Sequence, residues 1–422
     1  MKVKSPNRIS SMFTFFIVLL PCLSIYAIPG LNLPVSLGEA TIIVLILLIL
    51  LDMAAEKRSK VIATPFSIYL IYAFVSTVFV SALFLLLYQS YSISDMISRV
   101  VRDCLYMSLI VFFGKDYFDY QKAKKFIEIV ATLLSLYVFA QFFLYQVFDF
   151  YLSGFIPSVK TTISGGAISD EISAHFLKNA TIDGFVKAHG FLSEPAAAAH
   201  FLSTALLLEL IPLGRKINFK RAILYSAGMV FTFSVNAYIA LVFCWLVWMV
   251  VYARRGKEII HGIVFICVVL LFVIPTAINS DFVGAVVGRL TGLFSGESTQ
   301  NSAAMRVFRG WAFYFEMPFI YQLIGSGFGN FIEFKEALSI STVYEQADEY
   351  LNSNSYIAIS SGIIGLFLYV MGIWREASQK HPVAKCMALL LFLFGFSSSI
   401  YSSGMFVIMM LLIFNCPRKE NV

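Results

Sequence analysis

Residues 279–354 are the longest polar interruption in an otherwise apolar sequence, and they include the strings RVFRGW (306–311) and GSGFGN (325–330). Arg289 lies nearer the start of the same stretch. Charged side chains are costly inside a bilayer, so a segment with several arginines is not expected to cross one. We therefore expect apolar helices on both sides to hold residues 279–354 at a membrane surface as a loop.

The composition of the whole chain supports a membrane protein. Hydrophobic residues make up 59% of the 422 residues, charged residues make up 13%, and the mean hydropathy is +0.82. Soluble globular domains carry about 25% charged residues, so that class is excluded. A spanning helix needs about 20 apolar residues, which leaves room for about 12 spans. The predicted fold class is an all-α, polytopic transmembrane helix bundle, with residues 1–422 forming a single integral membrane domain.

Apolar segments and basic residues together predict how the chain crosses the membrane. Lysine and arginine favour the cytoplasmic ends of spans, and one topology places most of the 31 basic residues there. In that topology both termini are cytoplasmic. Two long loops, 149–194 and 279–354, lie on the outer face and carry short interfacial helices. The predicted spans lie near 11–29, 34–52, 64–88, 97–114, 125–148, 195–213, 222–235, 237–253, 260–278, 355–374, 384–400 and 402–416.

Some basic residues depart from this trend, because the topology places them on the outer side. Charge that opposes the topological preference indicates a function, and long loops in compact proteins are often functional. Both outer loops alternate polar and aromatic residues, which indicates ordered structure at the membrane surface. The outer basic residues are Arg99, Arg102, Lys160, Lys178, Lys187, Arg289, Arg306, Arg309 and Lys335.

The string KAHGFLSEP (187–195) leads into a predicted span. Ser193 is expected to be the N-cap of that helix, with Glu194 and Pro195 in the first turn, where acid and proline are both favoured. The functional alternative makes Glu194 a carboxylate that takes a proton from a hydroxyl group. The residues alone leave both interpretations open.

An amphipathic helix is predicted over residues 302–315. One interpretation is an interfacial helix whose arginines, Arg306 and Arg309, snorkel toward water. The other is a phosphate site, because guanidinium groups bind phosphate through two parallel hydrogen bonds. The second interpretation is favoured because Arg289 is in the same loop and Arg102 is at the same membrane face.

The glycines at 325–330 predict a tight turn. No βαβ pattern surrounds them, which excludes a dinucleotide-binding loop. Backbone amides in such a turn are also able to contact an anion. Arg99, Arg102 and Asp103 lie in an otherwise apolar span, where ionisable residues indicate either an ion pair or a functional site. Asp103 is expected to form an ion pair with Arg99 or Arg102. The alternative for Arg102 is that it faces the cavity.

Metal and nucleotide chemistry lack a sequence signal. No His/Cys cluster, HExxH or P-loop pattern occurs, so no metal site and no nucleotide energy source are expected. The cysteines lie in or beside apolar segments without paired spacing, which is typical of small buried hydrophobic residues.

Three segments together resemble the O-antigen polymerase and O-antigen ligase (Wzy/WaaL-like) superfamily of membrane glycosyltransferases. KAHGFLSEP (187–195) is similar to its basic-x-x-G-x-x-x-E-P signature. Arg306 followed by GSGFGNF (325–331) is similar to its R…W…P…G-x-G-x-G-N-F block. NSY…GIIG (354–365) is similar to its H-N-x-Y…G-I-I-G block. Their order along residues 187–365 is more specific than any one segment.

The resemblance implies transfer of a growing glycan from a polyprenyl diphosphate to an incoming lipid-linked repeat unit, on the outer face of the bacterial cytoplasmic membrane. Its implied partners are a polyprenyl-diphosphate-linked oligosaccharide and the lipid bilayer, with no nucleic acid and no cofactor; a chain-length regulator stays open. The two outer loops are expected to form one site that stabilises charge on the leaving diphosphate. The expected catalytic residues are Glu194, Arg306 and Arg289, and the expected substrate-binding residues are Lys187, Arg102, Arg309, Gly327, Gly329 and Asn354.

Two departures from the family pattern refine this expectation. Lys187 stands where family members often have arginine, so a bidentate phosphate contact is lost there. Ser353 stands where ligases have histidine before the asparagine, which favours the polymerase branch. A lipid-linked saccharide ligase remains one alternative. A flippase or secondary transporter is the other, although transporters place charges near the bilayer midplane in broken helices.

Overall fold

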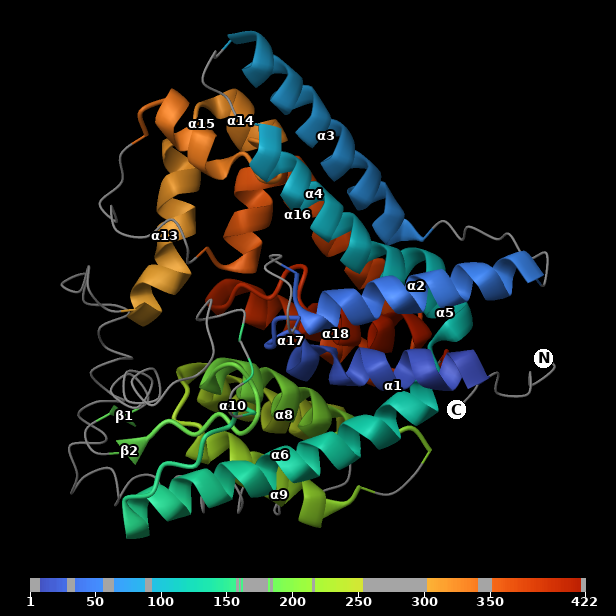
Figure 1. Cartoon of the computed structure of the whole chain (residues 1–422), viewed down its shortest axis with the longest axis vertical. Helices are drawn as coiled ribbons and strands as arrows, with labels where there is room; N and C mark the ends of the chain where they lie inside the picture. The colour runs from blue at the N-terminus through green and yellow to red at the C-terminus, as the bar shows by residue number, and fades with distance from the viewer. Residues whose placement is uncertain are drawn as a thin grey trace. The chain divides into compact units, whose positions relative to one another are not determined.

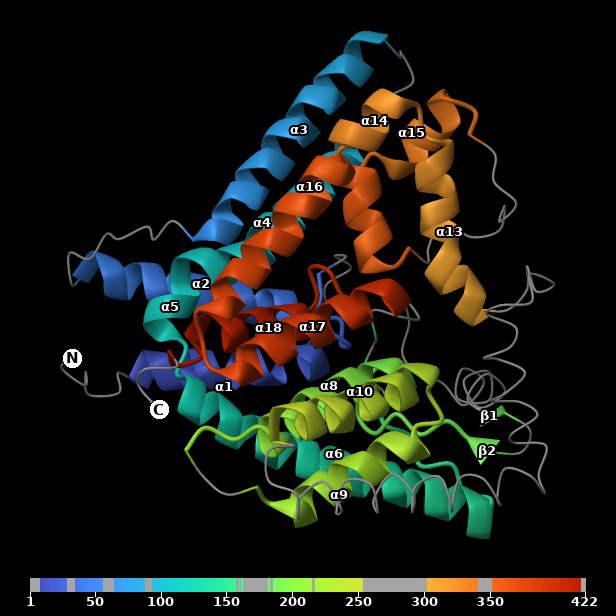
Figure 2. The same cartoon turned by 180° about the vertical axis from the view of Figure 1, so that it is seen from behind.

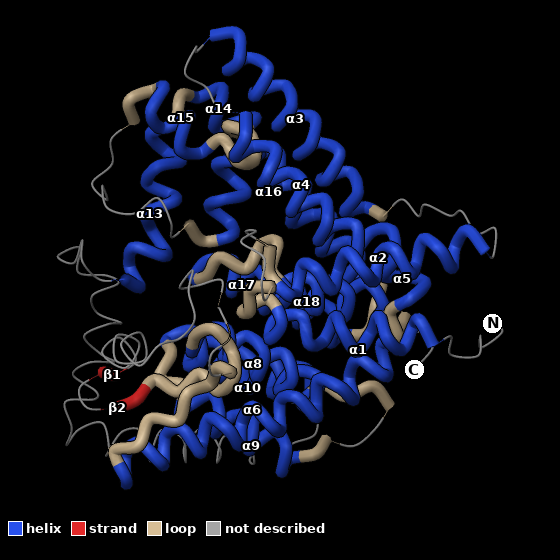
Figure 3. The backbone as a smooth tube through the Cα atoms, viewed as in Figure 1, coloured by secondary structure: helices blue, strands red, loops and turns tan. Residues whose placement is uncertain are grey.

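The computed structural model describes residues 8–28, 35–55, 64–87, 93–156, 159, 161, 181–182, 185–214, 217–252, 302–340 and 351–418. These residues are helical except for connecting loops and two short strands, β1 (Thr181–Ile182) and β2 (Phe185–Val186), which pair antiparallel. Figure 3 shows that nearly all of the described chain is helix or loop. The predicted all-α class is confirmed.

The packing contacts gather the chain into two compact units. Residues 1–48, 117–291 and 420–422 form the first unit, and residues 49–116 and 292–419 form the second. The first contains α1 (Arg8–Leu23), most of α2 (Leu37–Ala55), α6 (Tyr120–Phe148), α8 (Pro195–Leu210), α9 (Phe219–Phe231) and α10 (Val235–Tyr252). The second contains α3 (Pro65–Leu87), α4 (Ile93–Ser108), a π-helix (Leu109–Phe113), α5 (Gly114–Tyr117) up to residue 116, α13 (Ser302–Glu316), α14 (Phe319–Ile324), α15 (Phe331–Ala337), α16 (Ser353–Ser378), α17 (Pro382–Ser397) and α18 (Gly404–Asn415).

Helices long and apolar enough to cross a membrane occur in both units. Within the described residues these are Leu37–Ala54, Pro65–Leu87, Tyr120–Phe148 and Ser353–Ser378, judged by length and composition. Each predicted span that falls within the described ranges coincides with a helix, whereas the span near 260–278 lies outside them. The shorter apolar helices are Arg8–Leu23, Pro195–Leu210, Val235–Val251, Pro382–Ser397 and Gly404–Asn415.

The first unit is built around α6 and α8. In Figure 1, α8, α9 and α10 lie beside α6, and packing contacts join α6 to α1, α8 and α9. Ala198 and Ala199 of α8 are fully buried. Their small side chains let neighbouring helices approach α8 closely. The first turn of α6 is capped by Asp119, whose carboxylate accepts from the Gln121 and Lys122 amides at 3.0 and 3.1 Å.

The second unit is built on α3 and α16, which lie side by side in both views (Figures 1 and 2). Two glycines of α16 make this approach close. A β-carbon at Gly365 would lie 3.2 Å from the Tyr72 ring, and one at Gly372 would lie 3.0 Å from the Phe66 backbone. Small residues at such crossings allow dispersion contacts between backbones that larger side chains would prevent.

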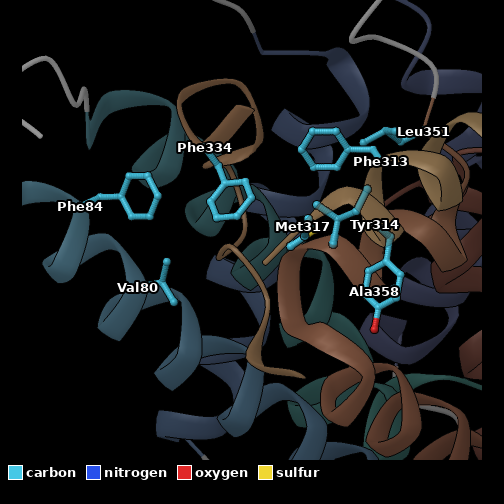
Figure 4. Packing of buried hydrophobic residues seen from close by; sticks show 9 residues of the cluster. Val80, Phe84, Phe313, Tyr314, Met317, Phe334, Leu351 and Ala358 are labelled. Atoms are coloured by element: carbon cyan, nitrogen blue, oxygen red, sulfur yellow. The ribbon is translucent and has the colours of Figure 1, made fainter. Parts of the chain in front are cut away.

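The predicted amphipathic helix over 302–315 is confirmed as α13, and its apolar face packs in the second unit. Its Phe313 and Tyr314, together with Met317 just after its end, form a core with Val80 and Phe84 of α3. Figure 4 shows Val80 and Phe84 on α3, with Phe334 of α15 between Phe84 and the α13 side chains. The Phe84 and Phe334 rings are 5.7 Å apart, so α13 and α15 are anchored on α3 by aromatic contacts.

Candidate functional site

The glycine turn between α14 and α15 fills a break in α16. Gly362 has φ 67° and ψ −178°, a backbone conformation that only glycine adopts readily and that interrupts the helix. Because the helix is interrupted at Gly362, the carbonyls just before it lose the backbone amides that would donate to them in a continuous helix. The Ser326 and Gly327 amides replace them, donating to the Ile359 and Ser360 carbonyls at 2.8 and 2.9 Å.

Steric complementarity reinforces these hydrogen bonds. Gly325 also has a positive φ, 87°, and a β-carbon added to it would collide with the Ser360 backbone. A β-carbon added to Gly362 would collide with the Leu323 backbone. The turn and the break therefore fit together only because both positions are glycine.

The same turn is joined to α3. The Phe328 amide donates to the Thr77 hydroxyl at 3.0 Å, and the Asn330 side-chain amide donates to the Ser81 hydroxyl at 2.9 Å. The predicted tight turn is confirmed. Gly327, which we expected to contact substrate, has its amide engaged by protein and a φ of 85°. Gly329, the other expected contact, has the same φ, so the conformation explains both glycines without a ligand.

The start of α16 is fixed by a cluster of buried polar side chains. The Ser353 hydroxyl donates to the Ser398 carbonyl at 3.0 Å and accepts from the Ile400 and Tyr401 amides at 2.7 and 2.9 Å. Asn352 caps the helix, since its side-chain oxygen accepts from the Ser355 amide at 2.9 Å. Ser353 therefore ties α16 to the loop between α17 and α18.

Asn354, an expected substrate-binding residue, points into this packing. It is 4% exposed, and its side-chain amide donates to the Phe392 carbonyl at 3.2 Å. Its Oδ1 is buried and has no hydrogen-bond partner among the described residues. Gly395 of α17 lies directly against this side chain. These contacts give Asn354 a packing role between α16 and α17.

A buried ionic and aromatic cluster lies in the second unit. The Arg99 guanidinium is 4.8 Å from the centre of the Tyr356 ring, and its Nε is 3.5 Å from Oδ1 of Asp103. The same oxygen accepts a hydrogen bond from the Ser402 hydroxyl at 2.5 Å. The predicted ion pair of Asp103 is confirmed with Arg99, which is four residues away on the same helix face. Arg102 is half-buried on α4.

Aromatic contacts join this cluster to the glycine turn. The Phe328 ring is 5.6 Å from the Tyr356 ring and 5.6 Å from the Tyr401 ring. Arg99, Tyr356 and Phe328 therefore form a continuous contact from α4 through α16 to the turn at 325–330. This arrangement brings together residues far apart in the sequence, and it was not predicted.

The structure tests the predictions for the arginines of the 279–354 loop to different extents. Arg309 is 4% exposed, so the interpretation in which it snorkels to water is wrong. Gly310 beside it lies against Ser355, which lets α13 approach the start of α16. Arg306 lies in α13 one turn earlier. Arg289, the third expected arginine of this loop, lies outside the described residues.

In the first unit, the segment 187–195 is held by one side chain of α6. Gln141 is 1% exposed, and its Oε1 accepts from the His189 and Gly190 amides at 3.1 and 2.7 Å. Its Nε2 donates to the Leu152 and Gly190 carbonyls at 2.9 and 3.2 Å. The segment was singled out from its sequence, but Gln141 was not. A polar residue within an apolar span was the signal that could have identified it.

Glu194 and Lys187 lie at the two ends of this segment. Glu194 is exposed and is the residue that precedes the first turn of α8, with φ −156° and ψ 161°. The expectation that Ser193 caps the helix is wrong, because Pro195 occupies its first position and forces the preceding residue to be extended. The Glu194 side chain makes no capping hydrogen bond. Lys187 is half-buried.

Between Lys187 and Glu194, the His189 imidazole is buried. Its Nδ1 lies 2.6 Å from the Leu192 carbonyl, and its Nε2 lies 3.3 Å from the Tyr151 hydroxyl. A proton on Nδ1 satisfies both contacts, with the tyrosine donating to Nε2. Burial lowers the pKa of His189 from its ordinary 6.5, because the charged form loses its hydration.

The expected site residues thus divide between the two units. Lys187 and Glu194 belong to the first, whereas Arg102, Arg306, Arg309, Gly327, Gly329 and Asn354 belong to the second. Within the described residues, no group of three or more His, Cys, Asp or Glu side chains is arranged to hold a metal ion. Neither a protein-family model nor a curated protein sequence matches this chain.

Proposed function

We propose that this protein is a polysaccharide polymerase that transfers a glycan from a polyprenyl diphosphate to a lipid-linked repeat unit. The supporting observation is the fit between the turn at 325–330 and the break at Gly362. These belong to two separate sequence blocks of the resemblance to O-antigen polymerases. Their mutual fit explains why glycines occur in both blocks.

The proposed reaction takes place at the outer face of a bacterial cytoplasmic membrane, in a chain with about 12 spans and both termini in the cytoplasm. The acceptor hydroxyl gives its proton to Glu194, and its oxygen bonds to the anomeric carbon of the donor glycan. The bond from that carbon to the diphosphate breaks, and the lipid diphosphate leaves with the electron pair. Arg306, Arg289, Arg102 and Arg309, with Lys187 assisting, stabilise the negative charge that develops on it.

The ligase alternative is disfavoured by the surroundings of Ser353. Its hydroxyl makes three hydrogen bonds in a buried position, and imidazole at this position would have to find other partners. The transporter alternative is disfavoured by the break in α16. Broken helices in transporters bind ions through freed carbonyls, whereas the Ile359 and Ser360 carbonyls accept from the glycine turn.

The test is complementation of a deletion strain with E194A and R306A, followed by measurement of the chain-length distribution of surface polysaccharide. We expect short or single repeat units at normal expression. S193A and R375A are the matched controls, the first next to Glu194 and the second at an exposed arginine of α16. Full-length polymer from E194A or R306A would remove that residue from the mechanism. Polymer retained but unattached in the deletion strain itself would indicate a ligase.

A further inference from the structure

Arg99 is held in a fixed orientation, which distinguishes it from a surface arginine. Its side chain is 27% exposed, and that of Asp103 is 13% exposed. The guanidinium lies over the Tyr356 ring at 4.8 Å, and the Asp103 carboxylate that faces it is itself held by Ser402. Cation–π contact and an ion pair together restrict both the plane and the rotation of the group.

The guanidinium has more hydrogen-bond donors than these partners can accept. Arginine carries five N–H donors and no acceptor. Its Nε is buried and has no hydrogen-bond partner among the described residues, and Oδ1 of Asp103 also receives the Ser402 hydroxyl. Tyr356 covers one face of the guanidinium with its ring and also accepts one hydrogen bond from it. The remaining N–H groups on the exposed part of the side chain are the ones that face a ligand.

A phosphate group fits this geometry better than a neutral sugar hydroxyl. Two terminal N–H groups of a guanidinium match two phosphate oxygens in parallel hydrogen bonds. Partial burial strengthens the attraction to an anion, because less water screens the charge. Asp103 reduces the net positive charge but fixes the direction of the fork, so the cluster favours an oxyanion that approaches along one line.

We propose that Arg99, oriented by Tyr356 and Asp103, binds a phosphate group of a prenyl diphosphate. The prenyl identity rests on the proposed function; the phosphate chemistry rests on the cluster itself. Phe328 packs on Tyr356 at 5.6 Å, so the glycine turn acts on this site by positioning the ring beneath the guanidinium. Arg99 then serves as a ligand-binding residue, and Tyr356 and Asp103 serve as positioning residues.

Binding by the purified full-length chain tests the proposal. The probes are farnesyl diphosphate and inorganic diphosphate, and the variants are R99Q, R99K and the control R375Q. For R99Q we expect farnesyl diphosphate affinity to fall about 10- to 100-fold, the range for lost charge-assisted hydrogen bonds. R99K keeps the charge but loses the fork, so a smaller loss is expected. R375Q should bind as the unmodified protein does.

The two probes distinguish the source of the phosphate. A loss confined to farnesyl diphosphate supports a lipid-linked ligand, and an equal loss for both probes supports a site for the diphosphate group alone. Unchanged affinity in R99Q at an unchanged melting temperature overturns the proposal. If R99Q does not fold, R99K decides, and wild-type affinity in that variant overturns it as well.

The outcome is separable from that of the proposed function. Normal polymer from E194A and R306A, together with lost diphosphate binding in R99Q, would reject the polymerase mechanism and keep the phosphate site. Polymer lost in E194A and R306A, with full diphosphate affinity in R99Q and R99K, would reject the phosphate site alone.

Discussion

The segment 187–195 and the turn 325–330 both carry a glycine and a polar signature, yet they are held in opposite ways. The first is held by one side chain, Gln141, which makes hydrogen bonds to the backbone on both sides of the loop. The second is held mainly through its own backbone, by amides that donate to α16 and to Thr77 and by glycines that fit against another backbone, and Asn330 adds a side-chain hydrogen bond to Ser81. The difference indicates which changes each region tolerates: the first depends on one side chain that is distant in sequence, and the second depends on glycines that leave room for another backbone.

The largest expected effect is at the crossing in the second unit. G362A and G325A each combine a strained backbone conformation with a collision against another backbone. Strain and overpacking together are expected to cost about 3 to 5 kcal/mol in free energy of unfolding. The measurement is the melting temperature and the yield of monodisperse protein in detergent.

The matched control for these variants is G214A. Gly214 also has a positive φ, 67°, but a β-carbon there has nothing within 4 Å. This variant isolates backbone strain, about 1 kcal/mol, from the collision. Equal melting temperatures for G214A and G362A would show that the crossing adds no steric requirement.

The next effect is the loss of the side-chain support in the first unit. Q141L leaves the buried His189 and Gly190 amides without their acceptor, at about 2 to 4 kcal/mol in total. Limited proteolysis should cut the 149–194 loop faster, and the melting temperature should fall. Q121L makes the same change at an exposed position of the same helix and should be nearly neutral. Protection of the loop in Q141L would contradict the role of Gln141.

Ser353 tests whether the start of α16, in the same unit as the turn, depends on a side chain. S353A removes the acceptor for the Ile400 and Tyr401 amides and is expected to destabilise by about 1 to 3 kcal/mol. The readout is again the melting temperature. S378A is the control, because the Ser378 hydroxyl bonds only within an exposed turn of the same helix. A loss in S378A as large as in S353A would reject the buried cluster as the cause.

The smallest effect is the pH dependence that His189 contributes in the first region. Burial lowers the pKa of His189 in the folded state, so below the ordinary 6.5 the unfolded chain binds a proton that the folded chain does not. Stability should therefore fall as pH drops below about 6.5, by at most about 1.4 kcal/mol per pH unit until the folded pKa is reached. Melting temperatures between pH 7.5 and pH 5 measure this slope.

In H189Q the part of the slope due to this residue should disappear, whereas H381Q should keep it. His381 is a partly buried residue that accepts a hydrogen bond from the Val383 amide, so it controls for loss of a histidine elsewhere. An unchanged slope in H189Q would assign the pH dependence to other groups.

The sequence predicted the helices well because most are continuous apolar segments with basic ends. It predicted the turn at 325–330 from its glycines and the Asp103 ion pair from spacing on one helix face. It did not predict the break at Gly362, because GIIG lies within an apolar run that is compatible with an unbroken helix. The partners of Ser353, Gln141 and Arg99 come from other elements, and such contacts depend on tertiary packing that local patterns do not encode.

The crossing of Gly325 and Gly362 has a consequence for how substitutions combine. A β-carbon at either glycine would collide with backbone that borders the other, so a first substitution that opens the crossing also relieves the collision at the second position, where only the strain of the positive φ remains. The double variant should lose much less stability than the sum of the two single losses. The pair is thus epistatic across 37 positions of sequence: once one glycine is lost, the other is required for its positive φ and no longer for the close approach of the two backbones.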